Sequence, residues 1–210
     1  MKKLIIAAAI LLSANASFAQ DGTAYEMGKS TVSLGYGFLS PFKTLFKLSS
    51  IFATDPTTTV KYSSLGPVAL TYEYGISEKF SVGGLVAFGN IKNVTTDKDG
   101  LGAGKDYIVT DKLDQFSVGV RGNYHFGSSA KFDPYIGLGL GYNSFKFKTT
   151  TNDPTDTPAD LALFAIKVPG ALGVSGQLGA KYYFSSNIGM YAEVGYLAGS
   201  FAQLGLTAKF

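Results

Sequence analysis

The residues that could carry chemistry in this 210-residue chain are few, and two of them occur only once. His125 is the sole histidine, Arg121 is the sole arginine, and the sequence contains no cysteine. A Ser/His/acid set for nucleophilic catalysis needs a histidine beside the substrate. His125 lies near one end of a predicted strand, where no second histidine accompanies it. We therefore expect a protein that is not an enzyme.

An acidic, glycine-rich segment is the candidate for a metal site. Asp97 and Asp99 precede Gly100, and Asp106 follows a few residues later. This spacing departs from the 12-residue loop that holds calcium in EF-hands, and a solvated loop explains it equally well. We expect no cofactor and no metal, with calcium binding in this loop as the alternative.

Five charged residues occur within segments whose other residues on the same face are mostly Gly, Ser, Ala and Thr. They are Glu73, Arg121, Lys181, Glu193 and Lys209. A guanidinium can bind two carboxylates at once, and a charge in a narrow buried space must be paired. We predict an ionic network centred on Arg121. It would act either as a plug that stiffens the fold or as a gate or selectivity element.

The elements that would position these residues are eight segments in which apolar and small or polar residues alternate. A period of two indicates a strand whose two faces meet different surroundings. Each segment has about the 9–11 residues that a tilted strand needs to cross a bilayer. The predicted strands cover residues 31–40, 67–76, 80–90, 113–126, 134–145, 170–184, 188–197 and 201–210.

The links between these strands alternate in length. Residues 77–79, 127–133 and 185–187 form short, turn-rich links, whereas 41–66, 91–112 and 146–168 are long. Only the last link on the long side, 198–200, is short. Tight turns on one side and long loops on the other are typical of outer-membrane barrels.

Aromatic residues on the apolar face gather at the strand ends, with aliphatic residues between them. Near the short links these are Tyr72, Tyr74, Phe80, Tyr124, Phe126, Tyr182, Phe184 and Phe210, and near the long links Tyr36, Phe38, Phe88, Phe116, Tyr142 and Tyr196. Aromatic rings favour membrane–water interfaces, so two bands indicate two interfaces. The opposite face carries too few charges for the exterior of a soluble barrel. We therefore predict an all-β, eight-stranded antiparallel up-and-down transmembrane barrel, with short periplasmic turns and long extracellular loops.

Composition and the first residues agree with export to a membrane. Only 16% of the residues are charged, against about 25% in soluble domains. Lys2 and Lys3 precede an apolar run, and Ser17-Phe18-Ala19 supplies the small residues of a cleavage site. We predict a cleaved signal peptide over 1–19 and one barrel domain over 20–210. Loss of Lys2 and Lys3 lowers the formal net charge from +3 to +1, so nothing favours nucleic acid.

The chain resembles the small Gram-negative outer-membrane β-barrel superfamily. The features that carry this resemblance are the leader, the eight alternating strands, the alternating link lengths, the aromatic bands and the terminal Lys209-Phe210. That superfamily includes porin-like proteins, the membrane domain of outer-membrane protein A and the outer-membrane protein X group. The resemblance covers the mature chain and is architectural. It implies location in the outer membrane, contact with its lipid, and recognition of Phe210 by the barrel-assembly machinery. The sequence has no counterpart of the peptidoglycan-binding domain that some relatives append, so we expect no anchoring to the cell wall.

The expected function is non-catalytic, contributing to envelope integrity or surface interaction. The alternative is a narrow porin-like channel or transporter for small solutes or hydrophobic ligands. Residues 42–52 place apolar side chains at helical intervals, so this segment would lie on the outer leaflet or cap the barrel mouth. Residues 160–166 are similarly apolar. Such loops could bind a surface or a small hydrophobic ligand, or pack together as a lid.

Overall fold

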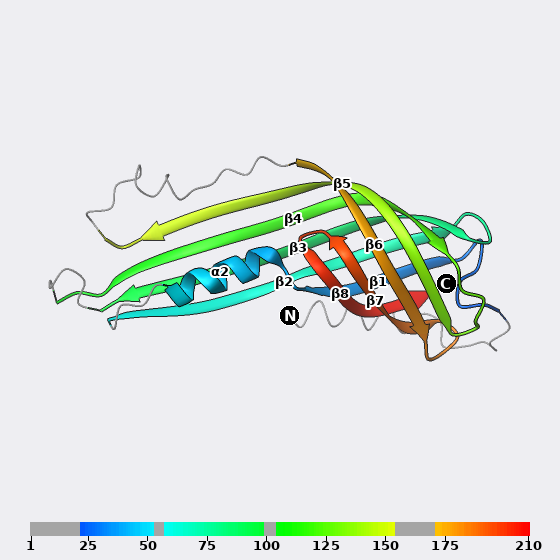
Figure 1. Cartoon of the computed structure of the whole chain (residues 1–210), viewed down its shortest axis with the longest axis horizontal. Coiled ribbons are helices and arrows are strands. Elements are labelled where there is room, and N and C mark those ends of the chain that lie inside the picture. The colour runs from blue at the N-terminus through cyan, green and yellow to red at the C-terminus, as the bar shows by residue number, and fades with distance from the viewer. Residues whose placement is uncertain (1–21, 53–56, 99–103, 154–170) are drawn as a thin grey trace.

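The computed structural model describes residues 22–52, 57–98, 104–153 and 171–210, and within them the chain forms a closed barrel of eight antiparallel strands (Figure 1). Each strand pairs with its neighbours in sequence, and the last closes on the first. The strands are β1 (Ser30–Phe38), β2 (Thr58–Gly75), β3 (Phe80–Asp97), β4 (Tyr107–His125), β5 (Phe132–Thr151), β6 (Ala171–Tyr183), β7 (Ile188–Leu197) and β8 (Ser200–Lys209). The predicted fold class is confirmed. The leader (1–19) and the apolar segment 160–166 lie outside the described residues.

The two faces of the wall differ in polarity as the alternation predicts. Leu138 on β5 and Val174 on β6 are 69% and 66% exposed on the outer face. On the inner face of the same barrel, Tyr135 and Tyr183 are at most 2% exposed. The outward aromatic side chains predicted for the two bands are likewise exposed, except that Phe210 is half-buried. An apolar exterior around a polar interior requires hydrocarbon rather than water outside.

Four strands continue well past the predicted boundaries. β2, β3, β4 and β5 contain 18 to 20 residues, so residues 58–66, 91–97, 107–112 and 146–151, which were expected in the long loops 41–66, 91–112 and 146–168, are strand. Beyond the hydrocarbon core neither face meets lipid chains, and the apolar–small alternation that marked the strands is lost there. Strand pairing nevertheless continues there, and Lys92 of β3 is the register partner of Lys112 of β4. The wall formed by these four strands projects beyond β1, β6, β7 and β8 (Figure 1).

The helix α2 (Pro41–Phe52) packs on the inner face of this projecting wall. The Phe42 ring lies 4.7 Å from Phe145 and the Phe46 ring 6.0 Å from Phe147, measured between centroids. The side chain of Asn93 donates a hydrogen bond to the Phe46 carbonyl at 3.2 Å. The helix therefore covers the mouth rather than lying on the outer leaflet. Within the described residues, no helix combines the length and apolarity needed to span a membrane.

Candidate functional site

Four of the five charged residues predicted to face inward meet at one level of the lumen. They are brought together by β2, β4, β6 and β7. Arg121 Nη1 donates to Glu193 Oε2 at 3.3 Å, and Nη2 contacts the other oxygen of the same carboxylate. Arg121 Nη2 also lies 3.4 Å from Glu73 Oε1. The second oxygen of Glu73 accepts a hydrogen bond from Lys181 Nζ at 2.5 Å. We call Glu73, Arg121, Lys181 and Glu193 the lumen cluster.

The lumen cluster is buried and contains as many cations as carboxylates. Its four residues are between 2% and 6% exposed. Tyr135 donates its hydroxyl hydrogen to Glu193 Oε1 at 2.7 Å, and its ring lies 4.9 Å from Lys181 Nζ. Charges removed from water are tolerated when they are paired and hydrogen-bonded in this way. The cluster is therefore electrically balanced where eight strands leave room only for side chains.

Glycines on the inner surface make room for the tyrosines beside the lumen cluster. A Cβ atom on Gly179 would lie 2.6 Å from the Tyr135 ring, and one on Gly35 would overlap the Tyr191 hydroxyl. Both tyrosines are buried. At this level of the lumen these glycines therefore accommodate tyrosine side chains.

Lys209 does not join the lumen cluster. Its Nζ lies 2.7 Å from Glu26 Oε1 and donates to the Thr23 carbonyl at 2.9 Å. Both partners belong to residues 22–29, for which the alternation predicted no structure. Lys209 is the last residue of β8, at the end of the barrel that carries the short turns. It therefore lies too near the periplasmic mouth to reach Arg121, which corrects the predicted five-residue network.

Residues 22–29 cover the periplasmic mouth of the barrel. The Tyr25 ring stacks on His125 with centroids 3.7 Å apart and planes 11° from parallel. The Tyr25 hydroxyl contacts the carbonyls of Ser77 at 2.9 Å and Phe80 at 2.6 Å. Burial, aided by the negative charge of Asp133, raises the pKa of Tyr25 to about 12. The phenol therefore stays protonated and able to donate at physiological pH.

Beneath Tyr25, the sole histidine forms a hydrogen-bonded set that sequence reasoning missed. His125 Nε2 lies 2.9 Å from Ser81 Oγ, and His125 Nδ1 lies 2.7 Å from Asp133 Oδ1. This order of groups matches that of a catalytic triad. All three side chains are at most 2% exposed, and Asp133 also faces Lys181 at 4.0 Å. The alternation places Ser81, His125 and Asp133 on the inner face, near the ends of β3, β4 and β5 that adjoin the short turns. This shared position was the sequence signal that could have identified the set.

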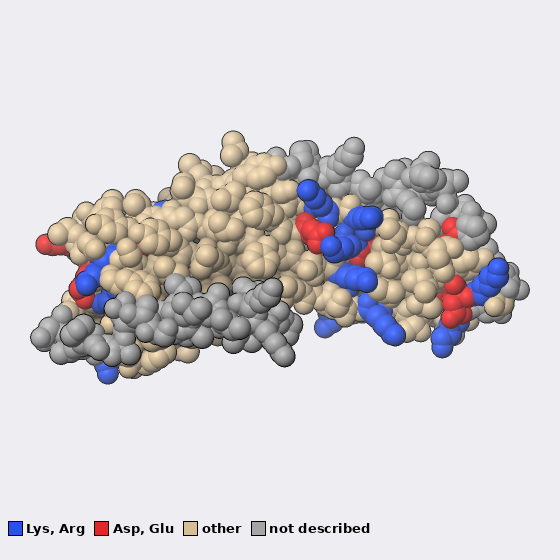
Figure 2. Space-filling model, turned by 180° about the vertical axis from the view of Figure 1, so that it is seen from behind, with Lys and Arg blue, Asp and Glu red and all other residues tan. Residues whose placement is uncertain are grey.

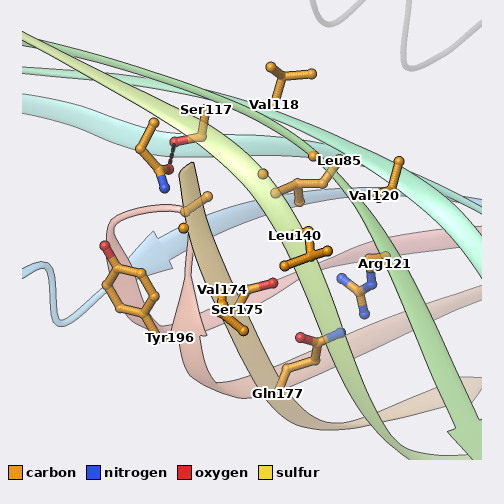
Figure 3. Close-up of a pocket in the computed structure, with 15 residues that line it drawn as sticks. Leu85, Ser117, Val118, Val120, Arg121, Leu140, Val174, Ser175, Gln177 and Tyr196 are labelled. Atoms are coloured by element: carbon orange, nitrogen blue, oxygen red, sulfur yellow. Dashed lines mark hydrogen bonds between the residues drawn. The ribbon is translucent and has the colours of Figure 1, made fainter. Parts of the chain in front are cut away.

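A small pocket of about 30 Å³ lies on the extracellular side of the lumen cluster (Figure 3). Arg121 and Gln177 are at its floor, while Leu85, Ser117 and Ser175 form part of its walls. Arg121 Nε and Gln177 Oε1 are buried and have no hydrogen-bond partner among the described residues. An unpaired donor and an unpaired acceptor could together bind a small group that has both functions.

The pocket lies beside an interruption in the hydrogen-bonded wall. Within the described residues, pairing between β6 and β7 ends at Gly176 and Tyr196, so that residues 171–175 have no β7 partner. Val174 and Tyr196 line the pocket at this point (Figure 3). On the extracellular side, Gln115 donates to the Ala198 carbonyl and helps to cover the lumen.

The acidic segment proposed for calcium is only partly described. The Asp97 carboxylate accepts a hydrogen bond from Thr57 Oγ1 at 3.1 Å, whereas Asp99 and Gly100 lie outside the described residues. Across the described parts of the chain, no group of three or more His, Asp or Glu side chains is placed to hold a metal ion.

Comparison with known proteins agrees with this architecture. The model of the OmpW family matches residues 40–201. The crystal structure of the outer membrane protein OprG from Pseudomonas aeruginosa is 16% identical, with 90% of this chain and 99% of that chain covered and a TM-score of 0.50. The solution structure of the E. coli Outer Membrane Protein W is 17% identical, with coverage of 89% and 100% and a TM-score of 0.44. No curated protein matches the sequence.

A further similar structure is that of Ail, the attachment invasion locus protein of Yersinia pestis. It is 15% identical, with 88% of this chain and 100% of that chain covered and a TM-score of 0.45. The family match spans well over half of the sequence and includes the strands that supply the whole lumen cluster. This protein is therefore a member of the OmpW family, located in the bacterial outer membrane with its apolar outer face in the lipid.

Proposed function

We propose that this protein is a sealed, non-catalytic outer-membrane barrel that supports envelope integrity and offers its projecting wall for surface interactions. The lumen cluster is the observation that carries this proposal. Its two carboxylates are ion-paired with its two cations, so these four groups together carry no net charge. Tyr25 covers the periplasmic side, and Gln115 with Ala198 narrows the extracellular side.

Solute release from proteoliposomes tests the seal. Vesicles are loaded with a small sugar or amino acid, and its release is compared with that from protein-free vesicles. We expect the solute to be released at the same rate from vesicles that contain the protein and from protein-free vesicles. Release that increases with the amount of wild-type protein would contradict the proposal.

The absence of catalysis belongs to the same proposal. Ser81, His125 and Asp133 have the hydrogen-bond order of a triad, but the stacked Tyr25 ring leaves His125 only 1% exposed. A fluorophosphonate probe should therefore leave Ser81 unlabelled in the folded protein. Labelling that disappears in Ser81→Ala would show a reactive nucleophile and overturn this part.

The pocket above the lumen cluster favours a second function, the binding or uptake of a small ligand. Its unpaired Arg121 Nε and Gln177 Oε1 suit a neutral group that both accepts and donates, such as a primary amide or a hydroxyl. Leu85 supplies apolar surface nearby. Titration with short-chain amides, followed by NMR, should shift signals from the pocket in wild type. If the amides shift the same NMR signals by the same amounts in Gln177→Leu as in the wild type, they do not bind at this pocket.

Two further proposals concern export and assembly. Residues 1–19 would be removed as a signal peptide, leaving Gln20 at the N-terminus, which mass spectrometry of the membrane-inserted protein can check. Phe210 would be recognised by the barrel-assembly machinery. Its backbone also pairs with Ser30, with N–H···O distances of 2.8 and 3.1 Å, so the same residue helps to close the barrel.

A further inference from the structure

The outer face of the projecting wall carries a group of lysines that the sealed barrel does not use. We call it the lysine band, and it consists of Lys61, Lys92, Lys112, Lys146 and Lys148. All five side chains are exposed and lie at outward positions of β2, β3, β4 and β5. Figure 2 shows a group of basic side chains near the middle of one face of the molecule, with acidic side chains in contact with it.

Strand register places three of these lysines in a row. Lys92 is the partner of Lys112, and Lys112 is the partner of Lys148. Side chains directly opposite each other on paired strands have Cβ atoms about 5 Å apart, and like charges in such positions are destabilising. The row therefore costs stability unless an anion lies between the ammonium groups.

The protein itself supplies little of the required negative charge. Lys112 Nζ forms an ion pair of 2.7 Å with Asp114, on the same strand. Beyond the aromatic band, Asp114 is the only carboxylate at an outward position in the described parts of β2 to β5. Five lysines against one aspartate leave four uncompensated positive charges on this surface.

The depth of the lysine band indicates which anion is available. Lys92 and Lys112 are each four residues farther from the bilayer centre than Phe88 and Phe116, which belong to the extracellular aromatic band. Four residues span about 13 Å along a strand, or about 9–11 Å along the membrane normal at the usual tilt. A bilayer headgroup layer is about 5–8 Å deep. Flexible lysine side chains can therefore reach the headgroups.

We propose that the lysine band binds the phosphate groups of phosphorylated glycolipids in the outer leaflet of the outer membrane. A phosphate between Lys92 and Lys112 or between Lys112 and Lys148 replaces repulsion by two attractive contacts. Lys61 and Lys146 extend the surface to further phosphates. The lipid would hold the projecting wall upright in the headgroup layer, independently of whether the lumen is sealed.

The test measures binding to the folded, full-length barrel in neutral detergent. The temperature at which the compact gel band is lost is measured with added bisphosphorylated lipid A, with the same lipid after removal of its phosphates, and with inorganic phosphate at equal phosphate concentration. We expect a rise with phosphorylated lipid A only, because a ligand bound to the folded state stabilises it. The rise should shrink at high salt.

The first variant is Lys92→Gln/Lys112→Gln/Lys148→Gln. Near an anionic surface each lysine contributes about 1 kcal/mol, so the triple variant should bind lipid A roughly 100-fold more weakly. A matched control, Lys29→Gln/Lys79→Gln together with Lys131→Gln, removes the same charge from exposed positions at the periplasmic end. This control should keep the wild-type response.

A second variant keeps the proposal testable if the triple variant folds poorly. Lys92→Glu places a carboxylate opposite Lys112, so it should stabilise the wall and still weaken lipid binding. An unchanged lipid A response in Lys92→Glu and the triple variant would overturn the proposal. An equal response to inorganic phosphate or dephosphorylated lipid, or an equal loss in the control, would also overturn it.

Discussion

Replacing Arg121 by methionine should destabilise the barrel by about 3–5 kcal/mol, the cost of removing one partner from a buried ion pair. Arg121 is 6% exposed, and it contacts both carboxylate oxygens of Glu193. Methionine retains an apolar stem, so packing changes little and the loss reports mainly on charge. The lumen cluster would then hold two carboxylates and only the ammonium of Lys181.

Adding Glu193→Gln to Arg121→Met makes the prediction sharper. The double variant restores neutrality, because Glu73 and Lys181 remain paired at 2.5 Å. Residues in one ion-pair network show coupling energies of about 0.5–3 kcal/mol. We therefore expect the double variant to lose less stability than the sum of the two single variants.

The assay is urea unfolding of the refolded barrel in lipid vesicles, followed by tyrosine fluorescence and by the mobility shift on unheated gels. Lys112→Met is the control, because its ion pair with Asp114 is exposed at the surface and should contribute only about 0–1 kcal/mol. Two results together would refute this reasoning. Arg121→Met would lower the free energy of unfolding no more than the control does, and the loss in the double variant would equal the sum of the losses in Arg121→Met and Glu193→Gln.

Three other variants test separate parts of the structure. Leu138→Arg should cost about 2–4 kcal/mol in the same unfolding assay if Leu138 faces the bilayer midplane. Gly139→Ala, whose Cβ would lie 2.5 Å from Ser175 Oγ, should instead cost about 1–3 kcal/mol through crowding of the lumen. Tyr25→Ala should expose His125 to diethyl pyrocarbonate, which should react slowly with the wild type. If diethyl pyrocarbonate reacts with Tyr25→Ala no faster than with the wild type, Tyr25 does not cover His125. If Leu138→Arg is as stable as the wild type, Leu138 does not face the bilayer midplane.

The membrane part of the barrel was predictable because lipid imposes a period of two on every strand. Leu138 and Val174 therefore lie outside, as predicted. The projecting parts of β2 to β5 were not predictable from that pattern, since water or headgroups surround their outer face. Lys92, for example, lies in an unbroken ladder but was assigned to a loop because its surroundings are polar.

The inward face of the site residues could also be predicted, but their depth could not. Glu73, Arg121, Lys181 and Glu193 meet because register places them at one level. Lys209 shares their face but lies at the barrel end, where it meets Glu26.

Contacts that join distant segments were likewise beyond the alternation pattern. The sequence of residues 22–29 contains no pattern that predicts the stacking of Tyr25 on His125, which lies a hundred residues later in the chain. Similarly, the helical spacing of 42–52 indicated a helix, but its position depended on contacts with Phe145, the last residue of the predicted strand, and with Phe147, which lies beyond it.

The most direct test of the sealed lumen is single-channel recording of the wild-type protein in planar lipid bilayers, over a range of voltages at high salt. The structure predicts no conductance steps beyond those of protein-free membranes. Arg121→Met, which unbalances the lumen cluster, provides the comparison. Stable steps in the wild type would contradict the account, and steps that are unchanged in this variant would in addition show that ions bypass the cluster.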